Sequence, residues 1–117
     1  MKKNTILPIA SSYDSMVSAL SRRHQNTLES ILRRPTNTIA FDVVDSLLLA
    51  CGAKKSNKGR TSGSRIGYLL KVGNGTYQIL FHRPHPGNEL GKRTVESIRD
   101  VLERIQQEQG NPGGGVL

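Results

Sequence analysis

The pattern of hydrophobic and polar positions predicts helices at both ends of the chain and strands between them. Residues 12–34 have weakly helical spacing, and the polar stretch 21–26 divides them into two helices. Pro35 ends the second helix, because proline disfavours a helical conformation in the residue before it. Residues 1–11 and 110–117 lack such spacing, so we expect a flexible lead and a disordered tail.

The third predicted helix has the clearest apolar face, which consists of Val43, Val44, Leu47, Leu48 and Cys51. Asp42 suits the positive N-terminal end of this helix. Asn37 or Thr38 is the expected N-cap, and Gly52 is a natural residue just after the C-terminus. A last helix over residues 92–109 has a similar face, made by Val95, Ile98, Val101, Leu102 and Ile105.

Two strands are predicted to form a hairpin around Asn74-Gly75, the preferred pair for a two-residue type I′ turn. This register sets Val72 opposite Tyr77, and it places one set of apolar residues on a single face: Tyr68, Leu70, Val72, Tyr77, Ile79 and Phe81. The opposite face is half polar, with Arg65, Gly67, Leu69, Lys71, Gln78, Leu80 and His82. The basic stretch 53–64 can supply a short edge strand and a mobile loop.

The order of these elements predicts an α+β fold, α-β-β-β-α with an extra N-terminal helix. A three-stranded antiparallel sheet with helices on one face is the architecture of double-stranded-RNA-binding domains, and it leaves the other face of the sheet open. We expect three parts: a lead with an extra helical segment over residues 1–37, one domain over residues 38–109, and the tail over residues 110–117.

Positive charge is concentrated in one part of the chain. The formal net charge is +8, and residues 53–99 carry ten Lys or Arg against two acids, so the rest of the chain is neutral overall. This segregation favours a polyanion-binding face. The single cysteine, Cys51, excludes an intramolecular disulfide and is expected to be a buried thiol. No membrane span or signal peptide is visible, so the cytoplasm is the expected location.

Several short motifs follow one another in the order found in a toxin family. They are the helix end Leu48-Leu49-Ala50-Cys51-Gly52-Ala53, the Gly63-Ser64 pair, the loop Pro84-His85-Pro86, and Glu89-Leu90-Gly91 before the last helix. Over residues 38–105 they resemble the HicA toxins, and residues 81–86 match a longer variant of the family that has Gly-Ser-Arg at its strand. The resemblance implies the double-stranded-RNA-binding-domain-like fold, metal-independent cleavage of RNA, and a HicB-type antitoxin that covers the basic face.

The strand motif of the family is Gly-Ser-His, and Arg65 stands where that histidine would lie. RNA cleavage without a metal needs a base for the ribose 2′-OH and donors that stabilise charge on the phosphate oxygens. Arginine stays protonated at neutral pH, so Arg65 can bind a phosphate but cannot be the base. Two other histidines are candidates for that role: His82, diagonal to Arg65 across Gly67 in the predicted register, and His85, in the proline-flanked loop.

The expected RNA contacts are Lys54, Lys55, Lys58, Arg60, Ser64, Lys71, Arg83, Lys92 and Arg93. Contacts with phosphates give affinity and salt dependence without sequence choice. The simpler alternatives are a solvated edge strand for the lysines, a half-exposed sheet residue for His82 and a helix cap for His85. The hairpin aromatics lie on the core face by parity, so base stacking is not expected. No cofactor is expected, and no metal site, because no Cys or Asp completes a ligand set with the histidines.

Two functions from different classes stay open. The chain is either a HicA-like toxin, an endoribonuclease that cleaves mRNA, or a non-catalytic basic module of the same fold that binds RNA or an acidic protein. A DNA-binding accessory protein ranks lower, because no helix-turn-helix with a basic recognition helix is visible.

Overall fold

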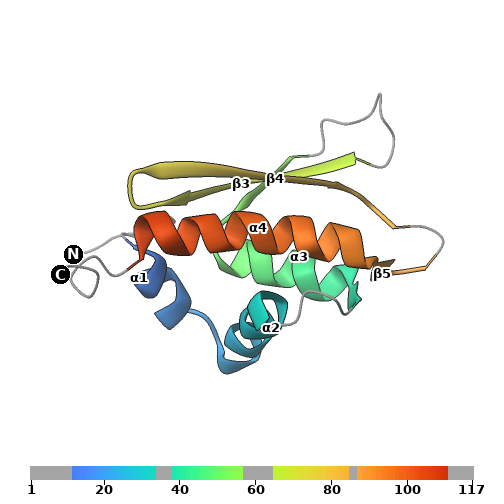
Figure 1. The fold of residues 1–117 in the computed structure, drawn as a ribbon, viewed down its shortest axis with the longest axis horizontal. Coiled ribbons are helices and arrows are strands. Elements are labelled where there is room, and N and C mark those ends of the chain that lie inside the picture. Colours follow the sequence, from blue (N-terminus) through green and yellow to red (C-terminus); the bar gives the residue numbers. More distant parts are fainter. Residues whose placement is uncertain (1–11, 34–37, 57–64, 85–86, 111–117) are drawn as a thin grey trace, which may run out of the picture.

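The protein forms three layers in a computed structural model that describes residues 12–33, 38–56, 65–84 and 87–110 (Figure 1). The first layer is a sheet with the order β2-β3-β4, made of β2 (Lys54–Ser56), β3 (Arg65–Val72) and β4 (Gly75–His82). Both strand pairs are antiparallel. The predicted α+β fold with a three-stranded antiparallel sheet is therefore confirmed.

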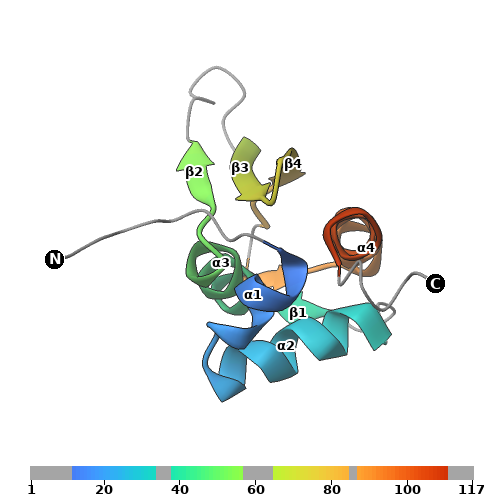
Figure 2. The ribbon, with the colours of Figure 1, turned by 90° about the vertical axis from the view of Figure 1, so that its left-hand side faces the viewer.

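The helices form the other two layers. They are α1 (Tyr13–Ser18), α2 (Arg22–Arg33), α3 (Phe41–Ala50) and α4 (Lys92–Gln109). Figure 2 shows α3 and α4 beneath the sheet and α2 on their far side, with α1 running from the level of α3 and α4 toward α2. One buried cluster runs through all three layers, and Ile31 of α2 is 0% exposed within it. The two N-terminal helices therefore pack against the same core as α3, α4 and the sheet.

The hairpin has the predicted faces but a different register. Val72 pairs with Gly75, so the turn is Gly73-Asn74, and Gly73 adopts a φ of 61°. The predicted register, with Val72 opposite Tyr77, is wrong by two residues. Because side chains alternate with a period of two, this shift keeps the apolar residues on the core side, and Tyr68, Leu70 and Ile79 are buried there.

The ends of α3 show one correct and one wrong prediction. Gly52 follows the C-cap residue with a φ of 100°, as expected of a residue just after a helix. The N-cap is Ala40, whose side chain caps nothing, so Thr38 is not the cap and Asn37 lies outside the described residues. The backbone N–H of Phe41 instead donates to the carbonyl of Asn88 at 2.6 Å.

That contact belongs to a small second sheet, which the sequence pattern did not predict. It pairs β1 (Ile39–Ala40) with β5 (Glu89–Leu90), so that Ile39 lies opposite Leu90. The pair ties the start of α3 to the segment just before α4. Both helices therefore begin at the same end of the molecule as the end of β4 (Figure 1).

The other differences concern the helices. The break between α1 and α2 falls at residues 19–21, and most of the polar stretch 21–26 lies inside α2. Ser21 caps the start of α2, since its Oγ accepts from the backbone N–H of His24 at 3.2 Å. Gln25 joins the two helices, because its Nε2 donates to the carbonyls of Val17 and Leu20 at 3.0 and 3.1 Å. α4 has its predicted bounds and buried face, with Val101 partly buried. Val43 is 42% exposed, so the apolar face of α3 is narrower than predicted. The expected lead, mobile loop and tail lie outside the described residues.

Candidate nucleic-acid interface

Among the described residues, no helix covers one face of the three-stranded sheet, and this open face carries positive charge (Figure 2). The three strands contain no Asp or Glu. By register and parity, the residues of the open face are Lys54, Ser56, Arg65, Gly67, Leu69, Lys71, Thr76, Gln78, Leu80 and His82. A surface with cations and no carboxylate attracts polyanions.

Arg65 and His82 lie directly opposite one another at one end of this face, and both are exposed. The predicted diagonal arrangement across Gly67 is therefore wrong, because the two-residue shift in register brings the two side chains closer together. Directly opposed residues in an antiparallel pair have Cβ atoms about 4.5–5.5 Å apart. A guanidinium and an imidazole at this spacing can contact the same phosphate group.

The middle of the open face is apolar. Leu69 and Leu80 are 40% and 46% exposed. Leu80 packs over Gly67, since a Cβ added at Gly67 would come within 2.9 Å of Leu80 Cδ2. The absence of a side chain at Gly67 therefore makes room for Leu80. The face combines charged ends with a central apolar contact area.

Lys71 is at the far end of the face, opposite Thr76 and next to the turn. Six residues of extended strand separate it from Arg65, or roughly 20 Å. Lys71 and Arg65 therefore cannot bind the same phosphate. Lys54 lies between these ends, on the edge strand opposite Leu69.

Lys55 points to the other side of the sheet and is already paired. Its Nζ lies 2.8 Å from Asp45 Oδ1, and the Tyr68 hydroxyl donates to the same oxygen at 2.6 Å. Burial alone would raise the pKa of Asp45, but these hydrogen bonds and the charges of Lys55 and Arg83 hold that pKa below its usual range. Asp45 therefore stays ionised at neutral pH and neutralises Lys55.

Arg83 also lies on this side, and its guanidinium carbon is 5.6 Å from the centroid of the Phe41 ring. Lys55 Nζ is 5.8 Å from the same centroid. Neither Phe41 nor Asp45 was predicted to belong to the site. In the sequence, Asp45 is visible only as a carboxylate beside the apolar face of a predicted helix. That position does not show which cation pairs with it.

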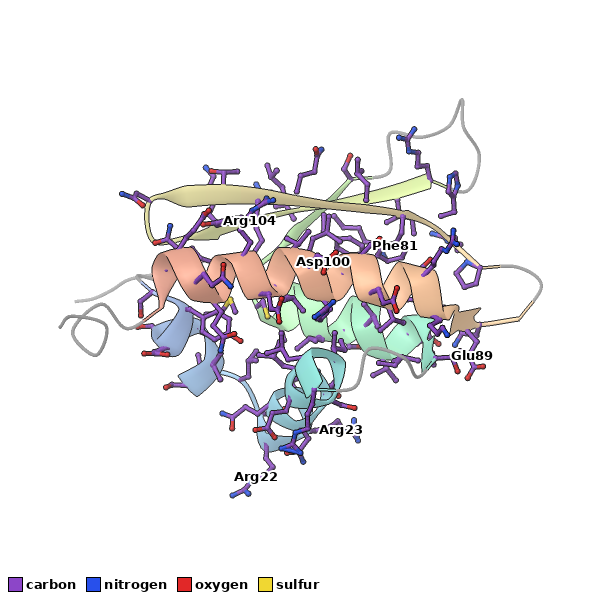
Figure 3. The ribbon with its side chains drawn as sticks, viewed as in Figure 1. Arg22, Arg23, Phe81, Glu89, Asp100 and Arg104 are labelled. Carbon is purple, nitrogen blue, oxygen red and sulfur yellow. The ribbon has the colours of Figure 1, made fainter. Side chains whose placement is uncertain are left out.

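Lys92 and Arg93 are exposed in the first turn of α4, which contains no acidic residue. Cations there are unfavourable for the helix dipole but add to the positive potential at that end. The end of β4 and the start of α4 lie together on one side of the molecule, where Figure 3 also shows Glu89. Four other candidates, Lys58, Arg60, Ser64 and His85, lie outside the described residues.

Aromatic side chains take no part in the open face. The chain has five, and all are buried: Tyr13, Phe41, Tyr68, Tyr77 and Phe81. Tyr68 and Phe81 stack on one another at 5.7 Å in the core. The predicted core position of the hairpin aromatics is confirmed, and the described surface has no ring on which an unpaired base could stack.

These features define a small α+β protein with a sheet backed by helices and a basic open face. Comparison with known families matches residues 42–107 to the family described as HicA toxin of bacterial toxin-antitoxin. The match spans more than half of the chain and confirms the resemblance seen in the sequence. The protein belongs to the HicA toxin family, whose members are toxins of bacterial toxin–antitoxin systems.

Other comparisons add no closer relative, since no curated protein and no solved structure matches the chain. Within the described residues, no helix is long and apolar enough to cross a membrane.

Proposed function

We propose that this toxin binds RNA along the open face of the sheet and cleaves it at the end where Arg65 faces His82. The direct opposition of these two exposed side chains is the observation that carries the proposal. Lys54 and Lys71 extend the positive surface away from that end, and no carboxylate of the three strands competes with phosphate. Burial of all five aromatics favours recognition through phosphates and shape.

The proposed chemistry gives each residue a separate task. His82 takes the proton of a ribose 2′-OH, and the 2′-oxygen attacks the adjacent phosphorus. Arg65 holds the phosphate oxygens bidentately as negative charge develops on them. The bond to the 5′-oxygen breaks, and this leaving oxygen takes a proton from water or from His85. The products are a 2′,3′-cyclic phosphate and a 5′-hydroxyl.

A specific observation favours a second function, a binding module that does not cleave. Arg65 stands at the position of the strand histidine in the HicA motif, and a guanidinium cannot take a proton at neutral pH. In such a module Arg65 binds phosphate, and His82 contributes little.

The deciding experiment combines induced expression in a bacterium with an assay of the purified protein on total RNA. Three variants test the site: Arg65→Ala, His82→Ala and Arg65→His. Arg104→Ala is the matched control, because Arg104 is a cation of α4 that lies over the Tyr77 ring, 5.7 Å from its centroid, near the hairpin turn (Figure 3). We expect growth arrest and RNA loss from the wild type and from the control.

Loss of a general base should slow cleavage by about 10²–10⁴-fold in His82→Ala while RNA binding persists. Cleavage unchanged in His82→Ala would exclude the proposed base. Intact RNA with the folded wild type, together with cleavage by Arg65→His, would identify the binding module and locate the lost activity at position 65.

We propose in addition that a HicB-type antitoxin covers the open face. The side chains of Leu69 and Leu80 have no donor or charge that binds a phosphate, whereas a protein partner can bury both of them. Leu69→Ser combined with Leu80→Ser should weaken capture of the adjacent gene's product. RNA affinity should stay within about twofold of the wild type, because neither substitution removes a phosphate contact. Equal loss of both interactions would show that the two leucines do not belong to a separate protein contact.

A further inference from the structure

Two cations converge on the ring of Phe41 beside the Arg65–His82 pair. Lys55 Nζ and the Arg83 guanidinium carbon lie 5.8 and 5.6 Å from the ring centroid, within the range of cation–π attraction. Only one carboxylate, Asp45, forms a described ion pair with either of them, and it pairs with Lys55. Arg83 is exposed, and among the described residues no ion pair engages its guanidinium.

Phe41 is firmly held. Its backbone N–H donates to Asn88, its ring packs edge-on against Phe81 at 6.1 Å, and its side chain is buried. Figure 3 shows Phe81 between the sheet and α4 at this end of the molecule. A guanidinium that rests on a fixed ring loses less conformational freedom when it binds a phosphate than a freely moving side chain would.

Arg83 also has the right place in the chain. It directly follows His82, so the two Cα atoms are about 3.8 Å apart. Side chains of consecutive residues point to opposite sides of a strand, and Arg83 accordingly lies beneath the sheet end while His82 lies on the open face. Arg83 lies over the ring of Phe41, the first residue of α3, and the β1–β5 pair ties this end of α3 to the start of α4 with its Lys92 and Arg93.

We propose that Phe41 is a positioning residue that holds Arg83 ready to bind the RNA phosphate next to the one bound by Arg65 and His82. The inference rests on the proposed function and extends the RNA path from the open face around the end of the sheet. Lys55 is not the contact at this position, because Asp45 neutralises it.

The test measures binding of a fluorescently labelled, single-stranded 2′-O-methyl RNA, which the 2′-OH chemistry cannot cleave. Fluorescence anisotropy gives Kd from about 50 mM to about 200 mM salt, a range over which phosphate contacts change affinity strongly. The variants are Arg83→Ala, Arg83→Lys, Phe41→Leu, and Phe41→Leu combined with Arg83→Ala. Arg104→Ala is again the control, since it removes a cation from another ring at the opposite end of α4.

Arg83→Ala should weaken binding about tenfold and lower the salt slope by about 0.7, the value for one phosphate contact on a single strand. Phe41→Leu should weaken binding about threefold with the slope unchanged, because the contact survives but is no longer pre-positioned. The double variant should match Arg83→Ala alone. Arg83→Lys should keep the salt slope but weaken binding, because lysine retains the charge and lacks the planar guanidinium. Position 83 is exposed, so this substitution should not disturb folding.

Different results overturn different parts of the scheme. A wild-type protein that does not bind this RNA overturns the proposed function together with the inference. Binding that depends on Arg65 but not on Arg83 overturns only the second contact. Additive losses in the double variant, or wild-type affinity in folded Phe41→Leu with weakened Arg83→Ala, would show that Phe41 does not position Arg83.

Discussion

Tyr68→Phe removes one buried hydroxyl and leaves the ring in place. Tyr68 is 1% exposed, its ring stacks on Phe81, and its hydroxyl donates to Asp45 at 2.6 Å. A hydrogen bond to a charged group contributes about 1.5–3 kcal/mol. Asp45 keeps its ion pair with Lys55 in the variant, so we expect the lower figure, a loss of about 1.5 kcal/mol in the free energy of unfolding. That corresponds to a fall in Tm of roughly 5–10 °C.

The pH dependence of this loss follows from Asp45. Its pKa is lowered in the folded protein, so its contribution is present above the unfolded value of about 3.9 and is lost as the pH falls through the folded pKa. The difference between the wild type and Tyr68→Phe should therefore be largest near neutral pH and shrink below about pH 4. The variant should also raise the pKa of the Asp45 carboxyl, because it removes one of the hydrogen bonds that lower it.

Urea denaturation at several pH values measures the free energies, and carboxyl-carbon NMR follows Asp45. Tyr77→Phe is the matched control, since its hydroxyl also donates to a carboxylate, at 2.7 Å, but that carboxylate belongs to the exposed Glu108. It should lose no more than about 1 kcal/mol. Equal losses in the two variants, or a Tyr68→Phe difference that persists at acid pH, would refute the electrostatic argument.

Three further predictions concern packing, backbone and charge. Ile31→Ala should destabilise the fold by about 2–5 kcal/mol in urea denaturation, because Ile31 is fully buried between the helices, whereas Val43→Ala should change stability by less than about 0.5 kcal/mol. Gly52→Ala should lower Tm by several degrees, since alanine at a φ of 100° costs of order 1–3 kcal/mol. Asp45→Asn should lower stability, because it removes the ion pair with Lys55. It should also raise RNA affinity and steepen the salt slope, because Lys55 is released to bind a phosphate. Unchanged RNA affinity would show that Lys55 cannot reach the RNA.

The sequence was sufficient for the faces of the sheet but not for its register. Residues 73–75 read Gly-Asn-Gly, which offers two overlapping turn pairs, and the chain uses Gly73-Asn74 where Asn74-Gly75 was predicted. Both choices keep the same parity, so the core residues came out correctly. The site is more sensitive, because a shift of two residues changes the partner of His82 from Gly67 to Arg65.

Contacts between distant segments could not be predicted. β1 and β5 are two residues each, too short for a periodic signal, yet they replace the expected side-chain cap of α3 with the carbonyl of Asn88. Phe41 and Asp45 meet Lys55 and Arg83 only after the sheet has packed on α3. A single sequence shows that a basic residue is present, but not whether a carboxylate already neutralises it.

The division of charge between the layers bears on how one face could serve two partners. The acids of the described residues lie outside the three-stranded sheet. On the proposed function, its open face therefore attracts both RNA and an acidic protein partner. Added salt weakens both attractions, but an RNA held through phosphates loses affinity steeply, whereas burial of Leu69 and Leu80 is not screened. An antitoxin that uses the leucines therefore retains affinity at salt concentrations that release RNA. On the proposed function, RNA and the antitoxin compete for the charged ends of the face. The apolar centre adds affinity for the antitoxin alone.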